Sequence, residues 1–231
     1  MGVVLSSGMS VRPDRPDHRP YKLFVFDWDG TLMDSIPTIL HCTWTTFDEL
    51  RLPRPDEAAI RRSIGLGIRE GVESYHPGLD DESFARILRT YRRHWLDSQH
   101  MSRLFDGVDG VLDELHQRGH LLAVATGKSR EGLDRELAKT ELGPRFQATR
   151  TVTESPSKPS PAMLHEILDE LRVDAADAVM VGDSTHDLEM ARSAGVDAVA
   201  VTSGSNSEQD LRARAPVACL GSVAELVDWM G

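Results

Sequence analysis

The chain is poor in lysine and cysteine and has no long apolar run. It contains 4 lysines against 22 arginines and only 2 cysteines. Two cysteines far apart in the sequence do not suggest a disulfide framework or a zinc site, so we expect a reducing, cytoplasmic location. No stretch approaches the length of a membrane span, and we expect no membrane partner.

The charge balance is acidic. The formal net charge of -11 argues against non-specific nucleic-acid binding, which needs a basic surface. Local cations must therefore hold any phosphate ligand, and the scarcity of lysine makes each lysine position informative. The four lysines are Lys22, Lys128, Lys139 and Lys158.

The length of 231 residues fits one core domain with an insertion, or two small domains. A hydrophobic content of 40% is enough to bury a core. Residues 1–20 are predicted to be a disordered N-terminal tail, because the segment 10–20 contains three prolines, three arginines and two aspartates and has little to bury.

Short apolar runs predict the strands of a parallel sheet. Residues 23–26 are all apolar and precede a loop that contains Gly30, which is typical of a buried strand. Helical patterns lie between the runs, so the sequence predicts an α/β, Rossmann-like parallel sheet with helices on both faces. The other predicted strands are residues 121–125, 178–181, 198–201 and 217–220, with a weaker one near 146–149.

The segment between the first strand and the rest of the sheet has a different pattern. Residues 36–102 show helical periodicity and no strand signal, and prolines separate the periodic stretches. We therefore expect an inserted all-helical cap domain over 36–102, and a core formed by 21–35 and 103–231. The expected hinges lie near 34–37 and 103–107. The predicted cap helices cover 39–50, 57–64, 68–75 and 82–96.

Polar side chains follow four of the predicted strands or their loops. They are Asp27 with Asp29, Thr126, Lys158, and Asp183 with Asp187. The carboxyl ends of parallel strands share one edge of a sheet, so these groups are expected to meet there. Close carboxylates repel unless a proton or a cation intervenes, and a divalent ion with oxygen ligands is the usual solution. A free carboxylate facing a phosphorus atom can act as a nucleophile.

The same residues carry a family resemblance. The chain from about residue 21 to 231 resembles the haloacid dehalogenase-like (HAD) phosphatases, and the insertion resembles their helical cap. Within that superfamily it is similar to phosphoglycolate phosphatases and their relatives. The four matching motifs, in order, are Asp27-Trp28-Asp29-Gly30-Thr31-Leu32, Ala125-Thr126-Gly127, Lys158-Pro159 and Gly182-Asp183-Ser184-Thr185-His186-Asp187.

The resemblance implies a role for each carboxylate and for the lysine. Asp27 would be the nucleophile and Asp29 the general acid/base. Mg²⁺ would be held by Asp27, the backbone carbonyl of Asp29, and Asp183. Asp187 would support the metal site or Lys158, which would bridge the nucleophile and the phosphate.

The resemblance also implies substrate contacts. Thr126 and the amide of Gly127 would bind phosphoryl oxygens. A glycine-rich turn at 65–69 would face the core from the cap, which makes Arg62 and Arg69 candidates for binding a substrate carboxylate or a second phosphate.

The expected function is a Mg²⁺-dependent phosphatase that hydrolyses a small phosphorylated metabolite, phosphoglycolate-like or similar, through an aspartyl-phosphate. Asp29 argues against a dehalogenase, and the lack of any lysine between Lys22 and Lys128 argues against a phosphonatase. A pyrophosphatase, a β-phosphoglucomutase-like phosphotransferase and a non-catalytic metabolite-binding regulator remain open, as does a homodimer.

Overall fold

The computed structural model describes residues 21–231. The predicted disordered tail, residues 1–20, lies outside the described residues. No helix within 21–231 is long and apolar enough to cross a membrane.

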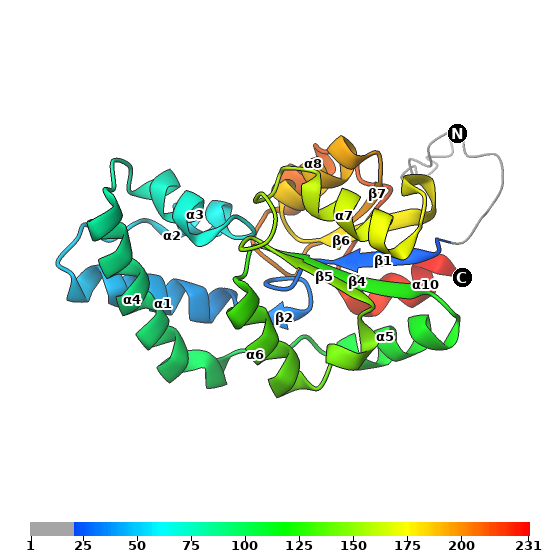
Figure 1. Ribbon diagram of the computed structural model, residues 1–231, viewed down its shortest axis with the longest axis horizontal. Helices are drawn as coiled ribbons and strands as arrows, with labels where there is room; N and C mark the ends of the chain where they lie inside the picture. Colours follow the sequence, from blue (N-terminus) through cyan, green and yellow to red (C-terminus); the bar gives the residue numbers. More distant parts are fainter. Residues whose placement is uncertain (1–20) are drawn as a thin grey trace, which may run out of the picture.

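A six-stranded parallel sheet forms the centre of the structure, as the sequence predicted (Figure 1). The strand order is β5-β4-β1-β6-β7-β8, which places β1 between β4 and β6. The chain moves from β1 to one side of the sheet and later to the other, and such a switch leaves a crevice at the carboxyl ends of the central strands. The strands are β1 Leu23–Phe26, β4 Leu121–Thr126, β5 Ala148–Thr151, β6 Ala178–Gly182, β7 Asp197–Val201 and β8 Ala218–Leu220.

Helices cover both faces of the sheet. Figure 1 shows α7 and α8 on one face, with α5, α6 and α10 on the other. These helices alternate with the strands, which confirms the α/β prediction. From residue 108 onward the helices are α5 Val108–Gln117, α6 Arg130–Thr140, α7 Ala162–Leu171, α8 Thr185–Ala194, α9 Glu208–Arg212 and α10 Leu226–Met230.

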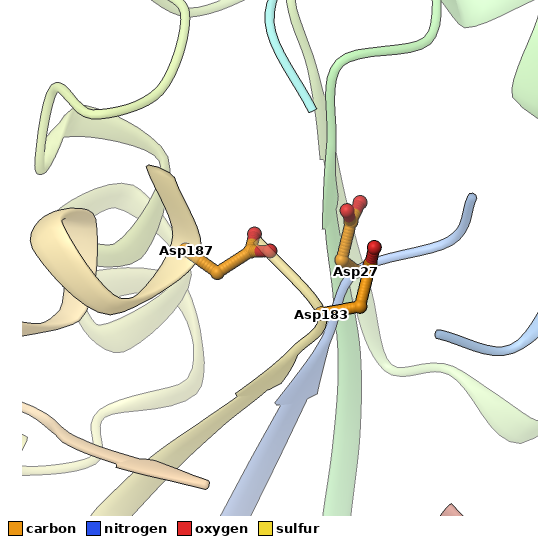
Figure 2. Close-up of side chains that lie close together, drawn as sticks. All are labelled: Asp27, Asp183 and Asp187. Atoms are coloured by element: carbon orange, nitrogen blue, oxygen red, sulfur yellow. The ribbon is translucent and has the colours of Figure 1, made fainter. Parts of the chain in front are cut away.

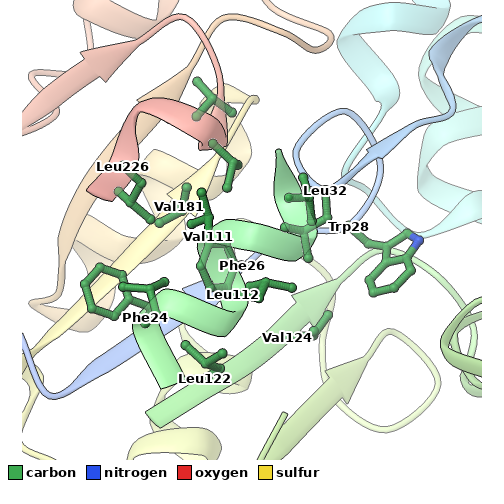
Figure 3. Close-up of a cluster of buried hydrophobic side chains, with 14 of the residues drawn as sticks. Phe24, Phe26, Trp28, Leu32, Val111, Leu112, Leu122, Val124, Val181 and Leu226 are labelled. Atoms are coloured by element: carbon green, nitrogen blue, oxygen red, sulfur yellow. The ribbon is translucent and has the colours of Figure 1, made fainter. Parts of the chain in front are cut away.

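Strand β1 explains why both faces are covered. Alternate side chains of a strand point to opposite faces, and every residue of β1 is apolar and fully buried. Phe24 and Phe26 join a cluster with Leu112 of α5 and Leu226 of α10 (Figure 3). Leu23 and Val25 join the second cluster, which includes residues of α7 and α8. Each buried Phe or Leu contributes roughly 1.5–3 kcal/mol of burial energy, so β1 is fixed firmly and its carboxyl end is a rigid platform.

Residues 36–98 form four α-helices, which lie beside the sheet in Figure 1. They are α1 Ile36–Glu49, α2 Glu57–Ser63, α3 Ile68–Tyr75 and α4 Asp81–Ser98. We call α1–α4 the helical insertion. A short antiparallel ribbon, β2 Met33–Asp34 with β3 Arg103–Leu104, joins its two ends at the positions expected for the hinges.

Some elements begin or end at other residues than predicted. Strand β5 begins at Ala148, two residues later than expected, because residues 143–145 form a 3₁₀ turn and the side chain of Gln147 accepts the backbone N–H of Leu122. The amphipathic residues 222–230 predict a C-terminal helix; the segment starts as a 3₁₀ turn at Val223 and becomes α-helical only at Leu226. The ribbon β2–β3 and helix α9 were not predicted, because each is too short to show a periodic pattern.

Candidate active site

Three aspartates from three elements form a buried acidic cluster (Figure 2). Asp27 follows β1, Asp183 follows β6, and Asp187 lies in the first turn of α8. One carboxylate oxygen of each lies within 4.8 Å of the others. The Oδ2 atom of Asp27 is buried and has no hydrogen-bond partner among the described residues. A buried acceptor without a donor is costly, so the cluster is suited to a bound cation.

Burial and mutual repulsion raise the pKa values of two of these carboxyls. Desolvation is the larger cause of the raised pKa of Asp27, and the charges of Asp187 and Asp183 add to it, while Lys158 acts in the opposite direction. Desolvation and then Asp187 raise the pKa of Asp183 to about 6. Positive charge near the cluster therefore favours its ionised form.

Asp183 is fixed by hydrogen bonds and by close backbone. Thr31 Oγ1 donates to Oδ1 at 2.8 Å, and the N–H and Oγ of Ser205 donate to Oδ2 at 2.7 and 2.8 Å. Gly30 has φ +83°, and a Cβ there would lie 2.5 Å from Asp183 Oδ2. Gly204 approaches the same carboxylate too closely for a Cβ. The loops after β1 and β7 thus enclose Asp183 and leave it one orientation.

Lys158 lies between two of the aspartates. Its Nζ is 2.8 Å from Asp27 Oδ1 and 2.7 Å from Asp187 Oδ1, and its side chain is completely buried. Burial opposes the charged form, but the two carboxylates outweigh it and raise the pKa of Lys158 above its ordinary value. Asp187 Oδ2 also accepts the N–H of Ser184, and Ser184 Oγ accepts the N–H of Asp187, which together form the capping box of α8. Ser184 Oγ donates to the same carboxylate oxygen at 2.7 Å. Lys158 is therefore a permanent cation held at Asp27.

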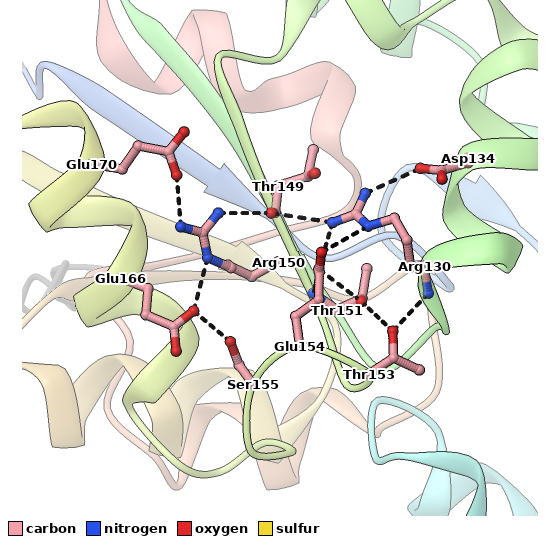
Figure 4. Close-up of polar contacts among 10 residues, drawn as sticks. All are labelled: Arg130, Asp134, Thr149, Arg150, Thr151, Thr153, Glu154, Ser155, Glu166 and Glu170. Carbon is pink, nitrogen blue, oxygen red and sulfur yellow. Dashed lines mark hydrogen bonds and ion pairs between the residues drawn. The ribbon is translucent and has the colours of Figure 1, made fainter.

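A second network fixes the loop that precedes the site lysine (Figure 4). Arg130 of α6 makes two hydrogen bonds to Glu154, at 2.6 and 3.1 Å. Arg150 of β5 and the hydroxyl of Ser155 both contact Oε2 of Glu166 on α7. Exposed ion pairs stabilise a protein little, but a network that ties one loop to two helices restricts where that loop can lie.

Asp29 lies beside the cluster and has partners of its own. Lys128 Nζ contacts both of its carboxylate oxygens, at 2.9 and 3.0 Å, and Ser35 Oγ donates to Oδ1 at 2.6 Å. Its side chain is not one of the three grouped carboxylates. The two aspartates of the first motif therefore have different surroundings: Asp27 faces Lys158, and Asp29 faces Lys128.

Comparisons with known proteins identify the family of this chain. A family model described as haloacid dehalogenase-like hydrolase matches residues 24–201. The chain belongs to this family. The resemblance inferred from the four motifs is thereby confirmed.

Several named relatives of this hydrolase are similar over most of their length. It is 34% identical over 228 residues to the phosphoglycolate phosphatase of Rhodospirillum rubrum, covering 91% of each chain. It is 33% identical over 188 residues to that of Mesorhizobium japonicum, covering 79% of this chain and 83% of the relative. A solved hydrolase from Pseudomonas syringae, 20% identical, superposes with a TM-score of 0.84 over 91% of this chain and 98% of the other, which supports the fold.

Lys128 is a residue of this HAD-like hydrolase that the sequence prediction did not assign. It directly follows Thr126-Gly127, and its Nζ lies 4.7 Å from the centre of the Trp95 ring of α4. It thereby links Asp29 to the helical insertion. Lysine is rare in this chain and Lys128 stands next to a motif, and both facts could have marked it as a candidate site residue. Its partner, Asp29, is visible only in the fold.

Thr126 and Gly127 occupy the expected edge of the sheet. Thr126 is buried, and its Oγ1 accepts the N–H of Lys128 at 3.2 Å. A Cβ at position 127 would lie 2.5 Å from the carbonyl oxygen of Leu66 and 2.7 Å from that of Gly65. Glycine at 127 therefore lets the backbone of the insertion approach the sheet edge.

Two more contacts join the turn of the insertion to the sheet edge. The N–H of Gly67 donates to Ser157 Oγ at 2.8 Å, and His186 Nε2 lies 2.9 Å from the carbonyl oxygen of Arg62. In both, the insertion contributes backbone atoms. Together with the approach at Gly127, they place the insertion directly over the carboxyl ends of the strands.

The two candidate arginines have different positions. Arg69 lines the cavity between the insertion and the core, but its guanidinium pairs with Glu73 at 3.2 Å and Asp81 at 2.6 Å. Arg62 is exposed and is not among the residues that line this cavity. Their proposed contact with substrate stays a prediction, and the structure gives no support to Arg62.

Helix α6 buries a carboxyl group near Lys128. Glu136 is 1% exposed, and neither carboxylate oxygen has a hydrogen-bond partner among the described residues. Desolvation is the main cause of its raised pKa; Asp29 adds to the rise, and the charge of Lys128 opposes it. Ionised Glu136 therefore destabilises the folded state.

We expect Glu136→Gln to stabilise the protein at neutral pH. A raised folded-state pKa means that the wild type loses stability as pH rises above the ordinary value of 4.5, whereas the variant does not. The gain should be about 1–2 kcal/mol at pH 7 and should shrink toward pH 4. Urea unfolding at both pH values measures it, with the exposed Glu131→Gln on the same helix as control. A variant no more stable than wild type at pH 7 would contradict the burial argument.

Proposed function

We propose that this chain is a Mg²⁺-dependent phosphatase that hydrolyses a small phosphorylated metabolite through an aspartyl-phosphate. The observation that carries the proposal is the meeting of three buried carboxylates with one buried ammonium, at Asp27. Family membership and relatives named phosphoglycolate phosphatase support a phosphoric monoester hydrolase.

The residues present fit a divalent metal ion. The cluster offers only carboxylate oxygens, which Mg²⁺ prefers, and the unpartnered Oδ2 of Asp27 is an acceptor that a cation would satisfy. Asp27, Asp183 and the backbone carbonyl of Asp29 would hold it, with Asp187 holding Lys158. When bound, Mg²⁺ would neutralise charge on the phosphoryl oxygens.

The side chains divide the reaction between them. Asp27 attacks the phosphorus atom, the bond from phosphorus to the ester oxygen breaks, and Asp29 gives its proton to the departing oxygen. Asp29 then takes a proton from water, the water oxygen attacks phosphorus, and the acyl-phosphate bond breaks to release phosphate and restore Asp27. Lys158 stabilises negative charge on the phosphoryl group in both steps, and Thr126 with the Gly127 amide orients it.

The helical insertion would act as a cap. We propose the division into a core of 21–35 and 103–231 and a cap of 36–102, with the ribbon β2–β3 as the connection. The cap would exclude bulk water and contact the leaving group. A cytoplasmic location and a homodimer also remain predictions.

The test is hydrolysis of p-nitrophenyl phosphate by the purified protein. We expect phosphate release with Mg²⁺, its loss on adding EDTA, and its return with excess Mg²⁺. A radiolabelled phosphoryl group should remain on the protein after acid quenching and be released by alkali, as an acyl-phosphate requires. Stoichiometric binding of phosphate esters without turnover, with Mg²⁺ and other divalent metals, would instead favour a binding protein.

We further expect Lys128→Met to lower kcat about 10- to 100-fold. Proton transfer by a positioned side chain contributes roughly 10²–10⁴-fold, and Lys128 is the cation that orients Asp29. Steady-state kinetics on p-nitrophenyl phosphate measures the loss. Lys139→Met is the matched control, because Lys139 Nζ donates to the carbonyl oxygens of Gln99 and Ser102 and contacts no site carboxylate. An unchanged kcat in Lys128→Met would remove this role.

A further inference from the structure

A cavity of about 520 Å³ extends from the site into the helical insertion. Asp27, Asp29 and Thr126 line its catalytic end. Its walls within the insertion are mainly apolar and aromatic, and they come from all four helices. They include Ile39, Phe47, Ile60, Val72, Leu88 and Trp95.

We propose that this cavity binds the leaving group of the substrate, and that this group is a bulky, largely apolar alcohol rather than a short carboxylate. The inference rests on the proposed phosphatase function and specifies its substrate class. A cavity of this volume is in the range of sites for ligands much larger than a two-carbon group.

The charges along the cavity oppose a short anionic leaving group. Three of the basic side chains in its wall already have acidic partners: Lys128 with Asp29, Arg69 with Glu73 and Asp81, and Arg135 with Glu131. The fourth, Arg92, is exposed. A carboxylate placed among the apolar walls would lose its hydration, and the wall cation left to it, Arg92, is exposed to solvent, whereas an apolar group gains by leaving water.

One buried polar atom refines the chemistry. Thr46 of α1 lines the cavity and is completely buried, and its Oγ1 has no hydrogen-bond partner among the described residues. Buried hydroxyls are normally paired, so this one fits a ligand that brings a partner.

The first experiment compares kcat/KM for three esters: ethyl phosphate, 2-(1-naphthyl)ethyl phosphate and phosphoglycolate. Ethanol and 2-(1-naphthyl)ethanol have similar acidity, so a difference in kcat/KM between their phosphate esters reports contacts of the leaving group. We expect the naphthylethyl ester to exceed both others at least tenfold. Equal values for the two alkyl esters, or a preference for phosphoglycolate that Arg92→Gln removes, would overturn the inference and leave the phosphatase function standing.

The second experiment fills the cavity. Leu88→Trp should lower the ratio of kcat/KM for naphthylethyl over ethyl phosphate at least tenfold. Arg89→Trp is the matched control, because Arg89 is the next residue of α4, is exposed and does not line the cavity, so its ratio should match the wild type. A ratio unchanged by Leu88→Trp would contradict the proposal.

A binding measurement separates this inference from the proposed function. Calorimetry should detect 2-(1-naphthyl)ethanol binding to the wild type and to Arg89→Trp, and at least tenfold weaker binding to Leu88→Trp. If this binding pattern appeared but no ester was hydrolysed, the phosphatase function would be refuted and the binding of an apolar alcohol in the cavity would be supported. Binding too weak to detect in the wild type would refute the cavity, whatever the hydrolysis rates.

Discussion

Asp27→Asn is expected to lower kcat by roughly 10⁴-fold or more, because an amide cannot form the acyl-phosphate and the nucleophile acts as a unit with its neighbours. The shape of the side chain is conserved, and its Oδ1 position can still face Lys158. The loss should therefore appear with little change in KM. Steady-state and single-turnover kinetics on p-nitrophenyl phosphate measure both quantities.

The same variant should gain stability in the absence of divalent metal. Asp27 is a desolvated carboxylate close to Asp183 and Asp187, and removing one of three negative charges relieves their repulsion. We expect the free energy of unfolding in EDTA to rise by about 1 kcal/mol or more. If Asp27→Asn lost both activity and stability, the variant would be misfolded. If it kept its activity, the covalent mechanism would be ruled out.

Lys158→Met is expected to have the second large effect, on both activity and stability. Removing the cation at the phosphoryl group should lower kcat roughly 10²–10³-fold. It also leaves Asp27 and Asp187 buried without a counter-charge, which should cost about 3–5 kcal/mol of unfolding free energy in EDTA. Denaturant unfolding and steady-state kinetics measure the two effects separately.

The double variant Lys158→Met with Asp187→Asn separates catalysis from folding. It removes the cation together with one of its two carboxylate partners. We expect part of the lost stability to return and the activity to stay low. If activity recovered along with stability, Lys158 would have only a structural role.

The sheet and the meeting of the site residues could be predicted from the sequence. The apolar runs at β1, β4 and β6 match the observed strands to within one residue, because buried parallel strands consist almost entirely of apolar residues. Residues directly after such strands must share one edge of the sheet. Asp27, Thr126 and Asp183 could therefore be placed together without any knowledge of side-chain geometry, whereas Lys158 was placed there by its loop before α7 and by its motif.

The remaining features depend on where side chains point after packing. The pairing of Lys128 with Asp29 spans 99 positions, and no local pattern indicates it. Glu136 lies in a helix whose exposed face is rich in charge, so its burial is hidden in the sequence. Glu73 lies four residues after Arg69 on the same helix and was a partner that the sequence could indicate, but the pairing with Asp81 is visible only in the fold.

The turn of the helical insertion meets the sheet edge through main-chain groups: the carbonyl oxygens of residues 62, 65 and 66 and the N–H of residue 67. Every amino acid supplies such atoms, although the backbone at Gly65, with φ +97°, favours glycine. Substitutions in the apolar walls of the cavity can therefore occur while these main-chain contacts are kept. Enzymes descended from one ancestor could therefore differ in substrate preference and still keep the contacts between the helical insertion and the sheet edge.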